Sequence, residues 1–72
     1  MSSQREEVRD HRNMIIGFIS DVGDKRVATH MKKGYAGYYN KNSNITLDNR
    51  GRIFAYGDAT QSLIRNMEYE GR

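Results

Sequence analysis

The stretch that decides the fold runs from residue 14 to residue 20 and reads MIIGFIS. It is rich in β-branched and aromatic residues and is followed by the turn-forming residues 21–24, so it predicts a β-strand. Alternation along a strand divides its apolar side chains between two faces, with Met14, Ile16 and Phe18 on one and Ile15 and Ile19 on the other. Since both faces are apolar, we expect this strand to be central in a sheet or covered by a partner.

Further hairpins are predicted on the C-terminal side of this strand. Residues 25–31 return along it, and a short strand over 35–39 is followed by a loop of Asn, Lys and Ser. Residues 45–47 and 52–56 then flank the turn Asp48-Asn49-Arg50-Gly51, where a glycine can supply a positive φ. The pattern predicts consecutive β-hairpins.

The two ends of the chain carry weaker signals. Residues 1–13 are polar, with Val8 the sole apolar residue after Met1, and we interpret them as a flexible or helical N-terminal arm. Asp58 and Gln61 have capping-box spacing and precede apolar residues at helical spacing, which predicts a helix over about 59–69. The sequence therefore predicts a mainly β (α+β) fold, in which residues 14–72 form one domain of consecutive antiparallel β-hairpins with a short C-terminal helix.

A short motif of an apolar, a tiny and an aromatic residue occurs three times. The copies are Ile16-Gly17-Phe18, Ala36-Gly37-Tyr38 and Phe54-Ala55-Tyr56, spaced twenty and eighteen residues apart. The segment from Asp48 through Gly51-Arg52 to Ala55-Tyr56 resembles the hairpin-repeat unit of bacterial four-fold β-flower proteins. The resemblance implies a hairpin architecture and no particular activity.

Size and composition favour self-association. A chain of 72 residues buries a small core, and with no cysteine it has neither disulfides nor thiolate metal sites to supplement that core. Oligomerisation is the remaining supplement. We therefore expect a non-enzymatic interaction or structural module whose homo-oligomer interface is the apolar strand, formed by Met14, Ile15, Ile16, Phe18 and Ile19.

The basic residues concentrate in the middle of the chain. The net charge is +3, but residues 25–52 carry seven Lys and Arg against one acidic residue. Such a segment either keeps strand edges soluble or binds nucleic acid, where cations neutralise phosphates and aromatic rings stack on bases. The candidate nucleic-acid contacts of this alternative are Lys32, Lys33, Tyr35, Tyr39, Lys41, Arg50 and Arg52.

Other function classes are disfavoured. With no thiol, two distant histidines and no phosphate-binding glycine loop, the sequence offers no catalytic residues, cofactor site or metal site, and we expect no enzyme. No run approaches the roughly 20 apolar residues of a membrane span, and the charged residues 1–12 lack a signal-peptide core, which favours a cytoplasmic protein. A small inhibitor or adaptor that binds another protein remains a further alternative.

Overall fold

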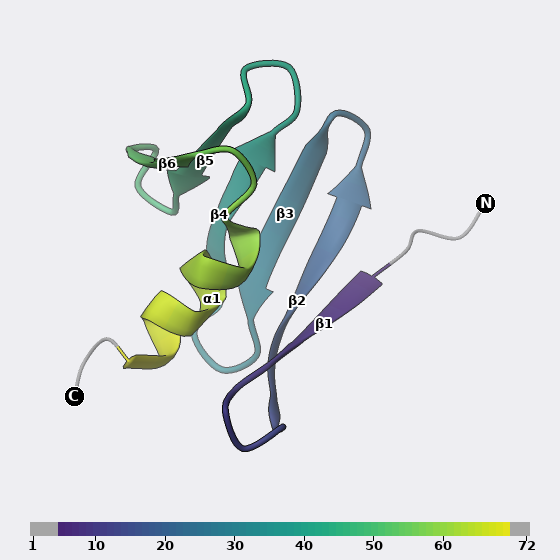
Figure 1. The fold of residues 1–72 in the computed structure, drawn as a ribbon, viewed down its shortest axis with the longest axis vertical. Coiled ribbons are helices and arrows are strands. Elements are labelled where there is room, and N and C mark those ends of the chain that lie inside the picture. The colour runs from purple at the N-terminus through teal and green to yellow at the C-terminus, as the bar shows by residue number, and fades with distance from the viewer. Residues whose placement is uncertain (1–4, 70–72) are drawn as a thin grey trace.

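Six antiparallel strands form one sheet, in which every strand pairs with its neighbours along the chain. The strands are β1 (Arg5–Arg9), β2 (Ile15–Val22), β3 (Lys25–His30), β4 (Gly34–Asn40), β5 (Ile45–Asp48) and β6 (Ile53–Tyr56). Helix α1 (Thr60–Tyr69) lies across one face of this twisted sheet (Figure 1). This computed structural model describes residues 5–69. The predicted fold of consecutive hairpins with a short C-terminal helix is confirmed.

The N-terminal residues correct one expectation. A helical or flexible arm was expected over residues 1–13, but residues 5–9 form the edge strand β1, paired with β2. The physical reason is Val8, which is 1% exposed and belongs to the core. One well-buried side chain and a ladder of backbone hydrogen bonds outweigh the weak helical preference of a polar segment. Residues 1–4 lie outside the described residues.

The pairs β1–β2, β3–β4 and β5–β6, called here the three hairpins, each contain one β-bulge, whereas β2–β3 and β4–β5 pair without one. The three bulges coincide with the three copies of the repeated motif. Val8 pairs with Gly17 and Arg9 with Ile15, so Ile16 is an extra residue. The same offset recurs in the other two hairpins, where the extra residues are Ala36 and Phe54. A bulge interrupts the alternation of side chains. Each extra residue and the small residue after it therefore lie on the helix side of the sheet, and the aromatic residue lies on the other side.

The bulge in β2 also changes how the apolar residues of that strand divide between the faces. Ile16 and Ile19 were expected on opposite faces, but both belong to the core beneath α1. That core consists of Val8, Ile16, Ile19, Ala28, Ala36, Leu63 and Ile64, with Met67 packed against it. Strand β2 is central in the sense that it pairs with β1 and β3, but only one of its faces is covered by the chain itself.

Side chains from the sheet hold the start of α1 in place. The buried Thr46 hydroxyl donates to the Gly57 carbonyl (2.6 Å) and accepts from the Ala59 amide (2.9 Å). Asp58 Oδ1 accepts from the Thr60 amide and hydroxyl, so Asp58 caps the helix as predicted. Gln61 does not reach back toward Asp58 as a capping box requires. Its amide instead donates to Glu6 on β1, where it ties the helix to the edge strand.

Candidate binding surfaces

The face of the sheet opposite α1, called here the open sheet face, is largely apolar. Strand register places side chains in rows across this face, because directly paired residues of antiparallel strands share a face. The middle row crosses all six strands and consists of Arg5, Ser20, Val27, Tyr38, Leu47 and Ile53. A second row consists of Val22, Lys25, Asn40, Ile45 and Tyr56. Ile53 is 55% exposed and Tyr56 is 78% exposed, so these rows end at an uncovered apolar edge.

Two cations partly cover aromatic rings of the open sheet face. The Arg5 guanidinium lies 4.4 Å from the centre of the Phe18 ring, and the Lys25 ammonium lies 5.0 Å from that of Tyr38. In such cation–π contacts the cation lies over one face of the ring but does not exclude all water from the ring. Phe18 and Tyr38 therefore remain only half-buried.

The structure divides the residues that were expected to form an oligomer interface. Ile16 and Ile19 lie in the core beneath α1 and are not available to a partner. Phe18 lies on the open sheet face, and Ile15 is half-buried. Met14 belongs to the β1–β2 turn and is 59% exposed. The apolar surface left for a partner is thus contributed by strands β2 to β6 rather than by β2 alone.

The turns within the three hairpins lie at one end of the sheet, and each is closed by a side chain at the same repeat position. Asp10 Oδ1 accepts from the Arg12 and Met14 amides, at 2.8 and 3.0 Å. Asp48 Oδ1 accepts from the Arg50 and Arg52 amides, at 2.9 and 3.0 Å. These hydrogen bonds favour the ionised carboxylate. The Met14 amide, followed by Arg12, lowers the pKa of Asp10, and the Arg52 and Arg50 amides lower the pKa of Asp48.

A histidine closes the middle turn. His30 is 3% exposed, and its Nδ1 accepts from the amides of Lys32 and Lys33, each at 3.1 Å. Because Nδ1 accepts hydrogen bonds, it carries no proton, and Nε2 donates to Glu68 Oε1 at 2.9 Å. His30 therefore serves as the counterpart of Asp10 and Asp48. Gly51, in the third turn, has a φ of 81°, as predicted for this turn.

The candidate nucleic-acid residues fall at the two ends of the sheet. Lys32 and Lys33 lie in the β3–β4 turn, and Arg50 and Arg52 flank the tip of the β5–β6 turn. Tyr35 is the second residue of β4. The side-chain Nδ2 of Asn49 donates a hydrogen bond to the backbone carbonyl of Tyr35 (3.3 Å) and joins the two turns. We call this group the basic turn end.

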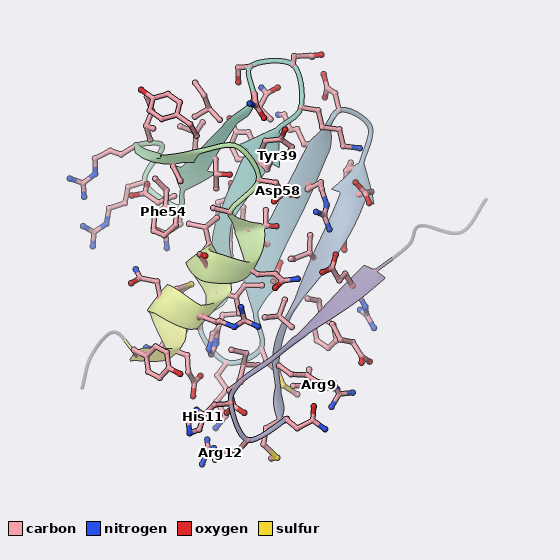
Figure 2. All side chains as sticks on the ribbon, viewed as in Figure 1. Arg9, His11, Arg12, Tyr39, Phe54 and Asp58 are labelled. Carbon is pink, nitrogen blue, oxygen red and sulfur yellow. The ribbon has the colours of Figure 1, made fainter. Side chains whose placement is uncertain are left out.

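The remaining two candidates lie elsewhere. Tyr39 lies near the opposite end of the sheet from the β1–β2 turn that carries Arg12 (Figure 2), and its hydroxyl donates to Asn44 Oδ1. Lys41 belongs to the β4–β5 loop and pairs with Asp21 at 3.1 Å. The sheet therefore brings five of the seven predicted residues together and separates Tyr39 and Lys41 from them.

Arg50 and Arg52 differ from the other arginines of residues 5–69. Each of the others contacts an acceptor or a ring within the chain, namely Arg5, Arg9, Arg12, Arg26 and Arg65. Neither guanidinium of Arg50 and Arg52 has such a partner in this part of the chain. Both line a hollow of about 140 Å³ whose other walls are Ala36, Asp48, Asn49, Phe54, Leu63, Asn66 and Met67. Figure 2 shows Phe54 on the helix side of the sheet.

Arg26 is a structural residue that sequence reasoning missed. Its guanidinium pairs with Glu6 on β1 and Asp58 before α1, and its Nε lies 3.6 Å from Asp21. Burial lowers the pKa of Arg26, but the hydrogen bonds that its guanidinium donates to Asp58 and Glu6 raise this pKa by more, so the net shift is upward. All three partners are distant or unremarkable in the sequence, so no local signal could have identified this cluster.

Comparison with known protein families, curated proteins and solved structures finds no match. Among residues 5–69, no three His, Asp or Glu side chains gather as metal ligands would. Over the same residues, α1 is too short and too polar to cross a bilayer. The open sheet face and the basic turn end are therefore the two surfaces on which functional proposals rest.

Proposed function

We propose that the protein is a non-enzymatic interaction module that self-associates through the open sheet face. The observation that carries this proposal is the apolar part of the middle row, which runs across β3 to β6 through Val27, Tyr38, Leu47 and Ile53 without a charged side chain. Isolated exposed apolar residues are ordinary, but a contiguous apolar surface is typical of an interaction site. Burying this surface would also supplement the core, which consists of seven buried apolar side chains among residues 5–69.

The size of this face suits a second copy of the chain. The two longer dimensions of the molecule are 33 and 30 Å, and the sheet extends across them (Figure 1). A specific interface needs about 800 Å² on each partner, and a face of these dimensions is large enough. Three surface hollows of about 140, 240 and 270 Å³ are each smaller than the roughly 300 Å³ at which ligand pockets begin, which favours a flat interface over an enclosed active site.

Ala55 argues against the other mode of self-association, in which the sheet would continue from β6 into a second copy. Ala55 directly follows the extra residue of its bulge, and the equivalent residues are Gly17 in β2 and Gly37 in β4. A Cβ on either glycine would overlap a backbone carbonyl of the next strand. Ala55 carries that Cβ at the same position in the edge strand β6. A strand added in the same register would meet it, so face-to-face association is favoured.

Sedimentation velocity from about 1 µM to 1 mM tests the proposal. We expect wild-type protein to exceed the 8.3 kDa of one chain at the higher concentrations, and the double variant Ile53→Glu/Tyr56→Glu to remain monomeric. Met31→Glu is the matched control, because Met31 is 58% exposed but lies in the β3–β4 turn, off this face. It should associate like wild type.

Two results would overturn the proposal. One is a folded wild-type monomer at 1 mM. The other is equal loss of association in the Met31→Glu control. Circular dichroism of each variant at low concentration shows whether it has folded, so loss of association is not confused with loss of structure.

A further inference from the structure

We propose that the basic turn end binds single-stranded nucleic acid, with phosphates at Arg50 and Arg52 and bases against the neighbouring exposed rings. The site includes one residue of the open sheet face, Tyr35, which pairs with Thr29, but none of the row through Val27, Tyr38, Leu47 and Ile53 on which the self-association proposal rests. It is formed by two adjacent hairpin turns, which the Asn49–Tyr35 hydrogen bond joins.

The two arginines carry the first step of the argument. Asp10 and Asp48, which occupy equivalent positions in two of the hairpins, close turns with their carboxylates. Asp48 Oδ1 accepts hydrogen bonds from backbone amides rather than from a guanidinium. The guanidinium groups of Arg50 and Arg52 therefore donate no hydrogen bond to an acceptor among residues 5–69, although their charges help to lower the pKa of Asp48, and both line a hollow whose walls are mainly polar. Guanidinium groups match the geometry of phosphate oxygens and form paired charge-assisted hydrogen bonds with them.

The exposed rings carry the second step. Tyr35 is 46% exposed and lies on the open sheet face beside the β3–β4 turn, whereas Phe54 is 36% exposed and lies on the helix side beside the β5–β6 turn. Proteins that bind single strands combine cations for the backbone with aromatic rings for base stacking. The hollow of about 140 Å³ is too small for a whole drug-sized ligand, so it suits one group of a longer chain.

The fold favours a single strand over a duplex. Reading the major groove requires an element that can enter it, usually a helix. Helix α1 packs Leu63 and Ile64 into the core and is tied to β1 through Gln61, so it is not free to do so. Stacking on Tyr35 and Phe54 further requires bases that are not already stacked in a duplex.

Fluorescence anisotropy with a labelled 12-nucleotide oligothymidylate tests the proposal. At about 20 mM salt we expect binding that weakens with salt, with a log–log slope of roughly −2 to −3 if three or four cations each neutralise a phosphate. Arg50→Gln/Arg52→Gln should weaken binding at least about fivefold and reduce the slope by about 1.4. Arg50→Lys/Arg52→Lys should keep the slope and lose affinity, since lysine lacks the paired geometry.

The matched control removes the same charge from the opposite end of the sheet. Lys25 and Lys41 flank the β2–β3 turn and the β4–β5 loop, and Lys25→Gln/Lys41→Gln should bind within about twofold of wild type. The monomeric variant Ile53→Glu/Tyr56→Glu should also bind, which separates this site from the self-association proposed above.

Three outcomes would overturn the inference. The first is no binding at 20 mM salt with 100 µM protein. The second is equal weakening by Lys25→Gln/Lys41→Gln, which would mean that overall charge rather than this site attracts the strand. The third is equal or tighter binding of a duplex of the same length.

Discussion

At the scale of single residues, the bulge positions impose a constraint that differs between interior and edge strands. A Cβ on Gly17 would lie 2.5 Å from the Thr29 carbonyl oxygen and 2.7 Å from Ile64 Cγ2. A Cβ on Gly37 would overlap the Leu47 carbonyl and approach Leu63 Cδ1 at 2.9 Å. Only Ala55, in the edge strand, has no further strand beside it within the sheet. The absence of a side chain at Gly17 and Gly37 is thus a packing requirement between strands and against the helix.

Gly37→Ala should therefore be strongly destabilising, by about 2–4 kcal/mol, because the φ of 142° disfavours any side chain and the backbone carbonyl cannot move aside. The control Ala55→Gly should cost only about 0.5–1 kcal/mol, from backbone entropy. Urea denaturation monitored by circular dichroism measures both. Similar midpoints for the two variants would mean that the strands can separate at this bulge without loss.

At the scale of elements, the position of α1 depends on side chains from strands distant in the chain. Thr46 on β5 bonds both sides of the turn that leads into the helix, and Arg26 on β3 pairs with the capping residue Asp58. The helix contributes Leu63 and Ile64 to the core in return. Docking of α1 is therefore as much a matter of buried polar contacts as of apolar packing.

Thr46→Val should lower the free energy of unfolding by about 2 kcal/mol, because the substitution leaves the Gly57 carbonyl and the Ala59 amide without their partner in a buried site. Thr29→Val makes the same chemical change at an exposed position of β3 and should have little effect. Thermal melts of both variants provide the comparison. Equal melting temperatures would show that water replaces the Thr46 hydroxyl at no cost.

At this scale, the elements that could be predicted are those whose sequence signal is local, and the elements that depend on strand pairing could not be predicted. The turn at Asp48–Gly51 and the helix with Leu63 and Ile64 were predictable because their signals are local. Strand β1 was not, since a strand with one apolar residue is recognisable only beside its partner. The faces of β2 were assigned wrongly because a bulge, which depends on pairing, breaks the alternation used to assign them.

At the scale of the whole molecule, the up-and-down topology decides which residues can share a site. Turns within hairpins gather at one end and connections between hairpins gather at the other. Lys32 and Arg50 are thereby neighbours in adjacent turns, whereas Lys41, closer to Lys32 in sequence than Arg50 is, lies at the far end. Charge counting along the chain finds the basic segment but cannot separate these ends, because the separation depends on strand order.

Three carboxylates in different parts of the molecule make its stability sensitive to acid. Backbone amides lower the pKa of Asp10 and Asp48 below 3.8. Burial raises the pKa of Asp58, but hydrogen bonds from Thr60 and the Arg26 ion pair outweigh it and lower the net value. A group with a depressed folded-state pKa stabilises the fold above its unfolded pKa, and this contribution is lost as the pH falls through the folded value.

We therefore expect these three carboxylates to leave the melting temperature nearly unchanged between pH 7 and about pH 5. As the pH is lowered below about 4, the melting temperature should decrease. Differential scanning calorimetry across this range measures the dependence. Asp10→Asn/Asp48→Asn should show a shallower acid loss from a lower starting stability. A variant with the same acid profile as wild type would assign the sensitivity to other carboxylates.

The pairing of each strand with its chain neighbour also has a consequence for folding kinetics. Each hairpin can form from residues that are close in sequence, so the contact order of the sheet is low. We therefore expect the sheet to form rapidly during folding. The contacts of α1 with β1, such as Gln61 with Glu6 and Arg65 with the Arg9 carbonyl, instead close loops of more than fifty residues. Closing them costs the most chain entropy. Helix docking is accordingly the step expected to set the folding rate, after the hairpins have begun to form.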